Sequence, residues 1–339
     1  MSGEEKLIAQ LVAAFGGTGR AEVGIGDDAA VLAAAEKMIV TTDLLIEGVD
    51  FTRAIPLELV AAKSLAVNLS DLAAMGAISR SFVLSIGLPA DLVASFSRFA
   101  AGLAEAARRW NVSLVGGDLS ASRDLTISIT AFGELPRGSA ALLRSGARPG
   151  DSLFLSRPVG AAAAGLHLLQ RGWSFVDVGG AVAPKDLPAE AGYAQKEFAG
   201  SAMRRHAAPD PEVELGPQLA ASGATACIDV SDGLSTDLHR LCRASGCGAL
   251  VEWARIPRFP DIESLGFSLG IDVARAVLHG GEELALLFTS RRTESELSAG
   301  LRRPVYRIGR MTEGTGVVLE KEDRQSELPA AGWDHFTKT

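Results

Sequence analysis

The sequence has few cysteines and no long apolar run, and each absence narrows the class of protein. Three cysteines in 339 residues, Cys227, Cys242 and Cys247, provide neither a disulfide framework nor a zinc spacing, and their odd number suits a reducing compartment. No apolar run approaches the roughly 20 residues that span a bilayer. Residues 1–6 are acidic and lack a signal-peptide apolar region. We therefore expect a cytoplasmic protein with no membrane partner.

Positive charge is also scarce. Lys and Arg number 33 against 41 Asp and Glu, which gives a formal net charge of −8, and no basic run is present. This balance argues against nucleic acid as a partner. An acidic protein that handles phosphates must use metal ions to offset the repulsion between like charges.

Several familiar catalytic motifs are missing. There is no Gly-x4-Gly-Lys-Ser/Thr loop, no His-Arg-Asp or Asp-Phe-Gly set and no Gly-x-Ser-x-Gly elbow. The five histidines show no paired spacing, which disfavours a histidine-based metal site. Residues 24–29 match Gly-x-Gly-x-x-Ala, but a strand is expected after them, whereas a dinucleotide fingerprint opens a helix.

Carboxylates recur at the ends of apolar segments. They lie in Gly24-Ile-Gly-Asp-Asp28, Thr41-Thr42-Asp43, Asn68-Leu-Ser-Asp71, Gly116-Gly117-Asp118 and Asp229-Val-Ser231-Asp232-Gly233. If the fold brings these ends together, their mutual repulsion requires cations among them. Oxygen ligands without histidine or cysteine suit Mg²⁺. Each turn by itself can also be a plain capped turn, so the number of such turns is what favours a site.

Hydrophobic periodicity predicts a mixed fold. Strands are expected at 38–42, 82–86, 112–115, 125–132, 152–156, 226–230, 249–253, 284–289, 306–308 and 317–319, and helices at 4–15, 56–76, 91–110, 160–170 and after Gly233. Residues 172–200 are expected to form a surface loop or partial helix. This alternation predicts an α/β or α+β fold, and the length favours two domains. The turn-rich stretch 146–151 separates domains 1–148 and 149–339.

The helix between Pro56 and Gly76 carries polar residues on an otherwise apolar surface. Lys63, Asn68 and Asp71 fall on related faces, because residues three or four apart are neighbours on a helix. This pattern indicates either one wall of a site or an exposed polar stripe.

Further along the chain, Gly280-Gly281-Glu282-Glu283 repeats the pairing of glycine with carboxylates.

These segments together resemble the thiamine-monophosphate kinases, in the superfamily of aminoimidazole ribonucleotide synthetase and selenophosphate synthetase. The resemblance runs through residues 24–29, 41–48, 63–76, 116–118, 144–151, 229–234, 280–283 and 332–336, in order and over nearly the whole chain. The helix segment 63–76 and the Ser231-Asp-Gly-Leu segment are its most specific parts.

The resemblance implies ATP-dependent phosphorylation of thiamine monophosphate to thiamine diphosphate with several Mg²⁺ ions. It implies a homodimer in which the N-terminal sheet pairs with that of a second subunit into a barrel, and a C-terminal α/β sandwich that closes the ATP and substrate cleft. The implied metal ligands are Asp28, Thr41, Thr42, Asp43, Asp71, Asp118, Asp229 and Asp232, with Asp71 and Asp229 central to catalysis. Gly117, Asp118, Arg144 and Ser231 are the implied ATP contacts, and Asp50, Glu282 and Trp333 face the substrate.

Three features depart from the family pattern. Asp50 stands where the family usually has histidine, Glu283-Leu284-Ala285 replaces Asp-Tyr-Glu, and the 172–200 stretch is longer than usual. Two alternatives therefore stay open. The chain can be a sister ATP-dependent enzyme with another acceptor, or a non-catalytic sensor of ATP and Mg²⁺.

Overall fold

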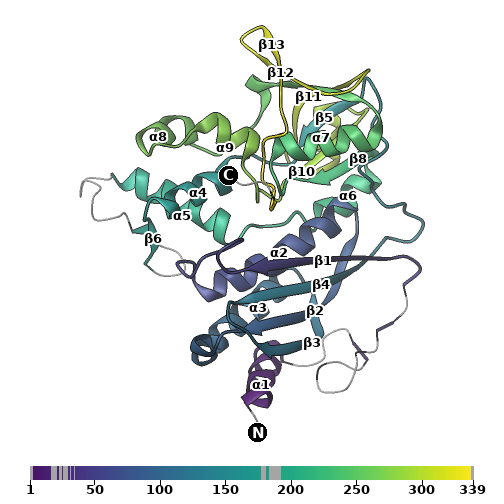
Figure 1. The fold of residues 1–339 in the computed structure, drawn as a ribbon. Helices are drawn as coiled ribbons and strands as arrows, with labels where there is room; N and C mark the ends of the chain where they lie inside the picture. Colours follow the sequence, from purple (N-terminus) through teal and green to yellow (C-terminus); the bar gives the residue numbers. More distant parts are fainter. Residues whose placement is uncertain are drawn as a thin grey trace.

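The described residues form two large β-sheets, each packed against helices, and one small two-stranded sheet (Figure 1). The structure is a computed structural model that describes residues 3–16, 21–22, 25, 30, 32–33, 35–176, 181–182 and 192–336. Helix α2 lies between the two sheets, because it contacts strand β1 of the first and strand β8 of the second. Within the described residues, every helix is too short or too polar to cross a membrane.

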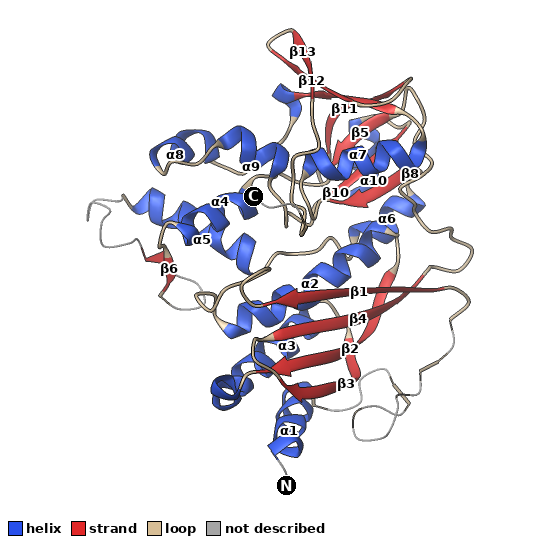
Figure 2. Cartoon of the chain, viewed as in Figure 1, coloured by secondary structure: helices blue, strands red, loops and turns tan. Residues whose placement is uncertain are grey.

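The first part of the chain forms a four-stranded sheet in the order β1-β4-β2-β3. Only the β2–β3 pair is parallel. The elements are α1 (Gly3–Phe15), β1 (Met38–Ile46), α2 (Leu57–Ala74), β2 (Ile78–Leu88), η1 (Ala90–Ser95), α3 (Phe96–Arg109), β3 (Ser113–Ala121) and β4 (Thr126–Glu134). Helices α1, α2 and α3 lie on one side of this sheet (Figure 2).

Helix α2 is buried on nearly all sides, as its mostly apolar and small side chains predict. Two glycines on its neighbours permit this close packing. A Cβ on Gly102 of α3 would lie 2.5 Å from the Glu58 Cα, and one on Gly216 of α6 would lie 2.1 Å from the Ala73 carbonyl oxygen. The backbone of α2 is therefore fixed tightly against both halves of the protein.

Among the described elements, no helix covers the opposite face of the first sheet (Figure 2), which is called the open face below. Along β1 the exposed side chains alternate, and Met38, Val40 and Leu44 are 46%, 54% and 54% exposed. This period of two is the strand signature, with one face toward the helices and the other toward solvent. Strand β1 also forms one edge of the sheet.

The second part of the chain builds a seven-stranded sheet in the order β13-β12-β9-β11-β5-β10-β8, in which only β12 and β9 pair in parallel. Its elements are β5 (Ser152–Leu155), α4 (Ala161–Gln170), β6 (Ser174–Phe175), β7 (Ala181–Val182), α5 (Tyr193–Ala207), α6 (Leu215–Ala221), β8 (Ala224–Asp229), α7 (Leu234–Ser245), β9 (Gly248–Glu252), η2 (Trp253–Arg255), α8 (Ile262–Ser268), α9 (Val273–His279), β10 (Leu286–Ser290), α10 (Glu294–Leu301), β11 (Tyr306–Thr312), β12 (Val317–Lys321) and β13 (Arg324–Glu327). Strands β6 and β7 pair separately.

Two apolar clusters cover the two faces of this sheet. Leu287 of β10 packs in the cluster that includes α7, whereas its neighbour Phe288 packs with α6 and α10. Adjacent strand residues point to opposite faces, so helices lie on both sides of the sheet. This arrangement matches the sandwich expected for the C-terminal half.

The structure confirms the mixed α/β character and corrects several local predictions. The prediction of a turn at Gly116-Gly117-Asp118 is wrong, because these residues continue strand β3. The strands predicted as a pair at 306–308 and 317–319 are not neighbours in the sheet, since β9 lies between β11 and β12. Within 172–200, residues from Tyr193 belong to helix α5. The predicted turn and strand at 24–32 lie largely outside the described residues, and Asp28 with them.

Candidate active site

Asp71 projects from the last turns of α2 toward strand β1. The Thr41 hydroxyl donates a hydrogen bond of 2.6 Å to Asp71 Oδ2. Burial raises the pKa of Asp71, while the Thr41 hydrogen bond and the positive charge of Arg144 oppose the rise. The first half of the chain thus presents a carboxylate at its boundary with the second half.

Asp229 meets the same helix from the second half. It ends β8, is 2% exposed, and accepts a hydrogen bond of 2.7 Å from Ser70 Oγ at Oδ2. Burial, together with nearby Asp71 and Asp237, raises the pKa of Asp229 well above its usual range. Asp71 and Asp229, predicted from separate motifs, are therefore brought together across the two halves.

Asp43 lies on strand β1, beside Asp71. Asp43, Asp71, Asp229 and Asp232 are together called the acidic group below. Its backbone N–H donates to Asn68 Oδ1 at 3.1 Å, so Asn68 fixes the strand against α2. Burial, followed by the charges of Asp71, Asp50 and Asp232, raises the pKa of Asp43 to about 7. Carboxylates from both halves therefore repel one another here, which is the electrostatic pattern of a site that takes up positive charge.

The loop after β8 is held by Asp237, one turn into α7. Asp237 Oδ2 accepts the backbone N–H groups of Ser231, Asp232 and Gly233 at 3.1, 3.0 and 3.1 Å. Arg240 reaches Asp232 Oδ2 at 2.5 Å and Asp237 Oδ1 at 2.7 Å. Burial and Asp232 raise the pKa of Asp237 to about 6, against Arg240 and these N–H groups. The Asp232 carboxylate is thus held by Arg240 where its charge acts on Asp43.

The segment 280–284 runs alongside this loop. The N–H groups of Glu282 and Leu284 donate to the Ser231 and Val230 carbonyl oxygens at 2.7 and 2.9 Å. A Cβ on Gly281 would lie 2.6 Å from the Ser231 oxygen, which explains the glycine. Both carboxylate oxygens of Glu282 are occupied by cationic or imidazole nitrogens, described further below.

Trp333 also docks on this loop. Its backbone N–H donates to the Asp232 carbonyl oxygen at 2.8 Å, and the preceding Gly332 N–H donates to Thr236 Oγ1 at 2.9 Å. The indole is 43% exposed and its Nε1–H donates to His335 Nδ1 at 3.3 Å. A half-exposed aromatic ring beside Asp232 can stack on a flat ligand.

Two further predicted residues of the site have distinct surroundings. The Asp50 carboxylate accepts the Ile46 N–H at 2.7 Å, which closes the turn after β1, and its charge acts on Asp43. Arg144 lies exposed on the segment between the two halves, and its charge acts on Asp71. Both therefore border the acidic group.

Thr42, Gly117 and Asp118 lie elsewhere. Thr42 accepts from Thr130 and donates to the Ile129 carbonyl oxygen, on the open face of the first sheet. Asp118 shares a row across the sheet with exposed Leu44, three strand spacings or about 14 Å away. The absence of a side chain at Gly117 has a packing reason, because a Cβ would lie 2.0 Å from the Leu84 oxygen. The single chain does not join these residues to Asp71 and Asp229.

The donor set fits a hard divalent cation. Asp43, Asp71, Asp229 and Asp232 supply carboxylate oxygens whose mutual repulsion a cation relieves. Over the described ranges, no three acidic, histidine or cysteine side chains are close enough to form a metal site by themselves. Mg²⁺ is usually held by one or two carboxylates together with phosphates and water, so this spacing suits a site that a nucleotide completes.

Sequence reasoning did not assign His206, Ser70 or Asp237 to the site. His206 was discounted because the histidines lack paired spacing, yet it meets Glu282 through the fold. Ser70 lies inside a motif that was used only for Asp71. The sequence did offer a signal for Asp237, because it lies six residues after Ser231 and four after Gly233, within reach of the backbone N–H groups of that loop.

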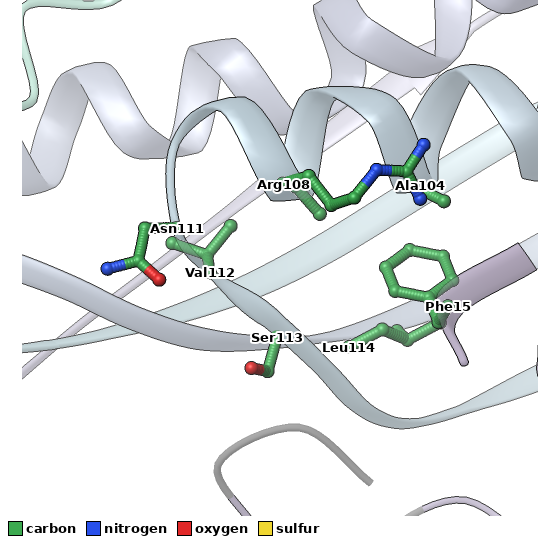
Figure 3. A pocket seen from close by; sticks show the side chains of 8 residues that line it. Phe15, Ala104, Arg108, Asn111, Val112, Ser113 and Leu114 are labelled. Atoms are coloured by element: carbon green, nitrogen blue, oxygen red, sulfur yellow. The ribbon is translucent and has the colours of Figure 1, made fainter. Parts of the chain in front are cut away.

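A separate pocket of about 250 Å³ opens between α1, α3 and β3 (Figure 3). Phe15, Arg108 and Leu114 are among its lining residues, and Arg108 donates to the Ala14 carbonyl oxygen. None of the predicted site residues lines it. The chemistry is therefore concentrated at the boundary of the two halves and not in this pocket.

Comparison with known protein families assigns both halves. The model for the AIR synthase related protein, N-terminal domain, matches residues 26–135, and the model for the C-terminal domain matches residues 148–322. The chain is similar to the thiamine-monophosphate kinase of Escherichia coli O157:H7, with 35% identity over 93% of this chain and 92% of that protein.

Two solved structures are similar over almost the whole chain. The thiamine-monophosphate kinase from Stenotrophomonas maltophilia K279a is 34% identical, with a TM-score of 0.78 over 94% of this chain and 96% of that one. AaThiL complexed with AMPPCP and TMP is 30% identical, with a TM-score of 0.76 over 98% and 97%. The two-domain fold is therefore shared with both structures.

Proposed function

Because the chain belongs to the thiamine-monophosphate kinase family within the AIR synthase related proteins, it is an ATP-dependent kinase of thiamine monophosphate, and we propose how its residues carry out the transfer. The γ-phosphoryl group passes directly from ATP to the phosphate of thiamine monophosphate. The bond from the γ-phosphorus to the β–γ bridging oxygen breaks, a bond to an acceptor phosphate oxygen forms, and ADP leaves. The acceptor oxygen is already anionic, so positioning matters more than a general base.

The acidic group at the domain boundary is the proposed metal-binding part. Asp43, Asp71, Asp229 and Asp232 would hold Mg²⁺, and Asp28 is a further predicted ligand. When bound, Mg²⁺ supplies neutralisation of the phosphate charge. Thr41 orients the Asp71 carboxylate and Ser70 orients that of Asp229, so both keep their positions as the substrates enter.

The ATP and acceptor contacts are proposed for residues around this group. Arg144 places a positive charge beside Asp71, where it can bind the triphosphate, and the Ser231 segment is presented by Asp237. Trp333 is half-exposed beside Asp232 and is the proposed stacking surface for thiamine monophosphate. Asp50 borders the same region through its charge on Asp43.

The open face of the first sheet is the proposed contact with a second copy of the chain. Val40 and Leu44 are each 54% exposed on edge strand β1, and burying them would stabilise a dimer. Thr42 and Asp118 lie on this face, so a second sheet placed against it would enclose both. A sedimentation mass of two chains, reduced to one by Leu44→Asp, is expected. A wild-type mass of one chain would contradict the dimer.

Formation of ADP from ATP and Mg²⁺ tests the reaction, with thiamine monophosphate, thiamine and no acceptor compared and thiamine diphosphate identified by mass. Asp71→Asn should lower turnover by about 100-fold or more while the melting temperature stays near that of wild type. Asp124→Asn, in an exposed turn, is the matched control and should keep full activity. ATP binding without acceptor-dependent turnover would instead indicate a sensor, and full activity of Asp71→Asn would exclude the proposed metal site.

A further inference from the structure

A lysine is completely buried at the boundary between the two halves of the protein. Lys63 of α2 is 0% exposed, and its Nζ donates to the Asp50 carbonyl oxygen at 2.9 Å. Its other partner is Glu282 Oε1 at 2.5 Å. A buried ammonium group is costly unless it is paired, so the contact with Glu282 is essential to the charge balance of this interface.

Glu282 joins this lysine to a buried histidine. Its Oε2 lies 2.8 Å from His206 Nδ1, and His206 is 4% exposed on α5. Burial and Lys63 lower the pKa of His206, so the neutral imidazole donates through Nδ1–H. Although burial alone would raise it, Lys63 and His206 lower the pKa of Glu282 to about 2. One positive and one negative charge therefore balance inside the interface.

The backbone that carries Glu282 is strained and firmly held. Glu282 and Leu284 have φ values of 63° and 48°, in the left-handed region that L-residues avoid. The Leu284 carbonyl oxygen accepts from Arg157 Nη2 at 2.7 Å. Such strain persists only where surrounding contacts determine the conformation. Here the contacts aim the Glu282 side chain at α2.

The Lys63–Glu282 pair joins two segments, and each of them is linked to carboxylates of the acidic group. Lys63 and Asp71 belong to the same helix, about 12 Å apart along its axis. Glu282 is hydrogen-bonded through its backbone to Ser231, next to Asp232. A tie between Lys63 and Glu282 thus sets the distance between carboxylates of the N-terminal half and those of the C-terminal half.

We propose that Lys63, Glu282 and His206 form a positioning clamp that holds the carboxylates of the two halves at the spacing required for metal binding. This inference rests on the proposed function and deepens it, because it assigns Glu282 to positioning and not to substrate contact. Both oxygens of Glu282 are already occupied, and releasing either one would take from Lys63 its charged partner or from His206 its carboxylate acceptor.

Binding of Mn²⁺ in the presence of AMPPCP, followed by electron paramagnetic resonance, tests the clamp without any phosphoryl transfer. Glu282→Gln leaves the Lys63 charge unpaired and should weaken Mn²⁺ binding about 10-fold or more. Lys63→Met combined with Glu282→Gln removes both charges, lets the interface close again and should bring the affinity within about 3-fold of wild type. Equal loss in the single and double variants would mean that Glu282 acts directly on the ion, and would overturn the proposal.

A matched control separates positioning from general destabilisation. Asp151 is another buried carboxylate, and it accepts from Thr225 Oγ1 at 2.8 Å and from Arg291 Nε at 3.3 Å, near the start of β8, whereas Asp229 ends that strand. Asp151→Asn should lower the melting temperature without changing Mn²⁺ affinity. The same loss of affinity in this control would refute a specific clamp. The proposal would also be refuted if Glu282→Gln kept its Mn²⁺ affinity but had a higher KM for thiamine monophosphate, because that result identifies a substrate contact.

If Glu282→Gln does not fold, His206→Ala provides the same comparison, since it keeps the Lys63–Glu282 pair. It should weaken Mn²⁺ binding about 5-fold, and an unchanged affinity would refute the clamp. Failure of the proposed function is distinguishable, because it appears as wild-type protein that binds Mn²⁺ and AMPPCP but forms no ADP with thiamine monophosphate.

Discussion

The buried carboxyl group of Glu283 should make folding stability depend on pH in a predictable direction. Its Oε1 accepts the Gly160 and Ala162 N–H groups at 2.9 Å each, at the start of α4. Burial raises the pKa of Glu283 to about 7 from its ordinary value of 4.5, against these N–H groups and Arg157. The folded chain therefore holds a proton here that the unfolded chain releases.

The size of the effect follows from the two pKa values. Between pH 4.5 and 7 the folded state binds more protons, so the free energy of unfolding falls as pH rises through this window. A difference of about 2.5 in pKa corresponds to roughly 3 kcal/mol at about 1.4 kcal/mol for each pKa unit. Above about pH 8 the group is ionised in both states, the loss is complete and stability no longer depends on it.

Glu283→Gln isolates this contribution. The amide is neutral at every pH and its oxygen can still accept both N–H groups, so any packing cost is the same across the range. Relative to wild type, the variant should gain roughly 3 kcal/mol between pH 4.5 and pH 8, with most of the change between pH 5 and 7. Urea unfolding of both proteins, followed by tryptophan fluorescence at each pH, measures the difference.

A matched substitution on the surface controls for the loss of one carboxylate. Glu105 is exposed on α3, and Glu105→Gln should stay parallel to wild type at every pH. A difference between Glu283→Gln and wild type that stays constant within about 0.5 kcal/mol from pH 5 to 8 would show that Glu283 is ionised in the folded chain. The assignment of a raised pKa would then be wrong.

Three further predictions concern packing, the acidic group and the aromatic contact. Gly216→Ala places a Cβ 2.1 Å from the backbone of α2 and should lower the free energy of unfolding by about 1–3 kcal/mol, as measured by thermal unfolding. In contrast, the Cβ of Gly300→Ala meets nothing within 4 Å, and this variant should stabilise the protein by about 0.5–1 kcal/mol. Ser70→Ala leaves the buried Asp229 carboxylate without its 2.7 Å donor and should cost about 1–3 kcal/mol in urea unfolding; no loss would mean that water replaces the hydroxyl. Trp333→Ala should raise the KM for thiamine monophosphate about 10-fold with little change in that for ATP, and equal increases would argue against stacking on the acceptor.

The sequence by itself determined the local elements that carry the acidic residues. An Ala-rich composition bounded by Pro56 and Gly76 located α2, and the apolar residues at 38–42 identified the strand that presents Asp43, which extends to Ile46 in the structure. These features follow from local chemistry, because proline suits the first turn of a helix and glycine the position just past its end. The motif resemblance added the reaction, since it depends on the order of short segments and not on their contacts.

Only the tertiary structure decided which faces meet. Alternation along β1 separates Thr42 from Thr41 and Asp43, but the sheet order and the helices decide which side becomes the site. The same register carries Asp118 to the open face. The glycine pair before Asp118 belongs to strand β3 and not to a turn. Gly117 is needed there because a side chain would collide with the Leu84 carbonyl oxygen.

The contacts among Lys63, His206 and Glu282 show the limit most clearly. Each residue lies on a different element, and no periodicity or spacing relates them in the sequence. A buried charge chooses its partner by proximity in the folded interface, where desolvation makes pairing necessary. Local patterns thus determined which carboxylates were present, and long-range packing of α2 between the two sheets decided which of them act together.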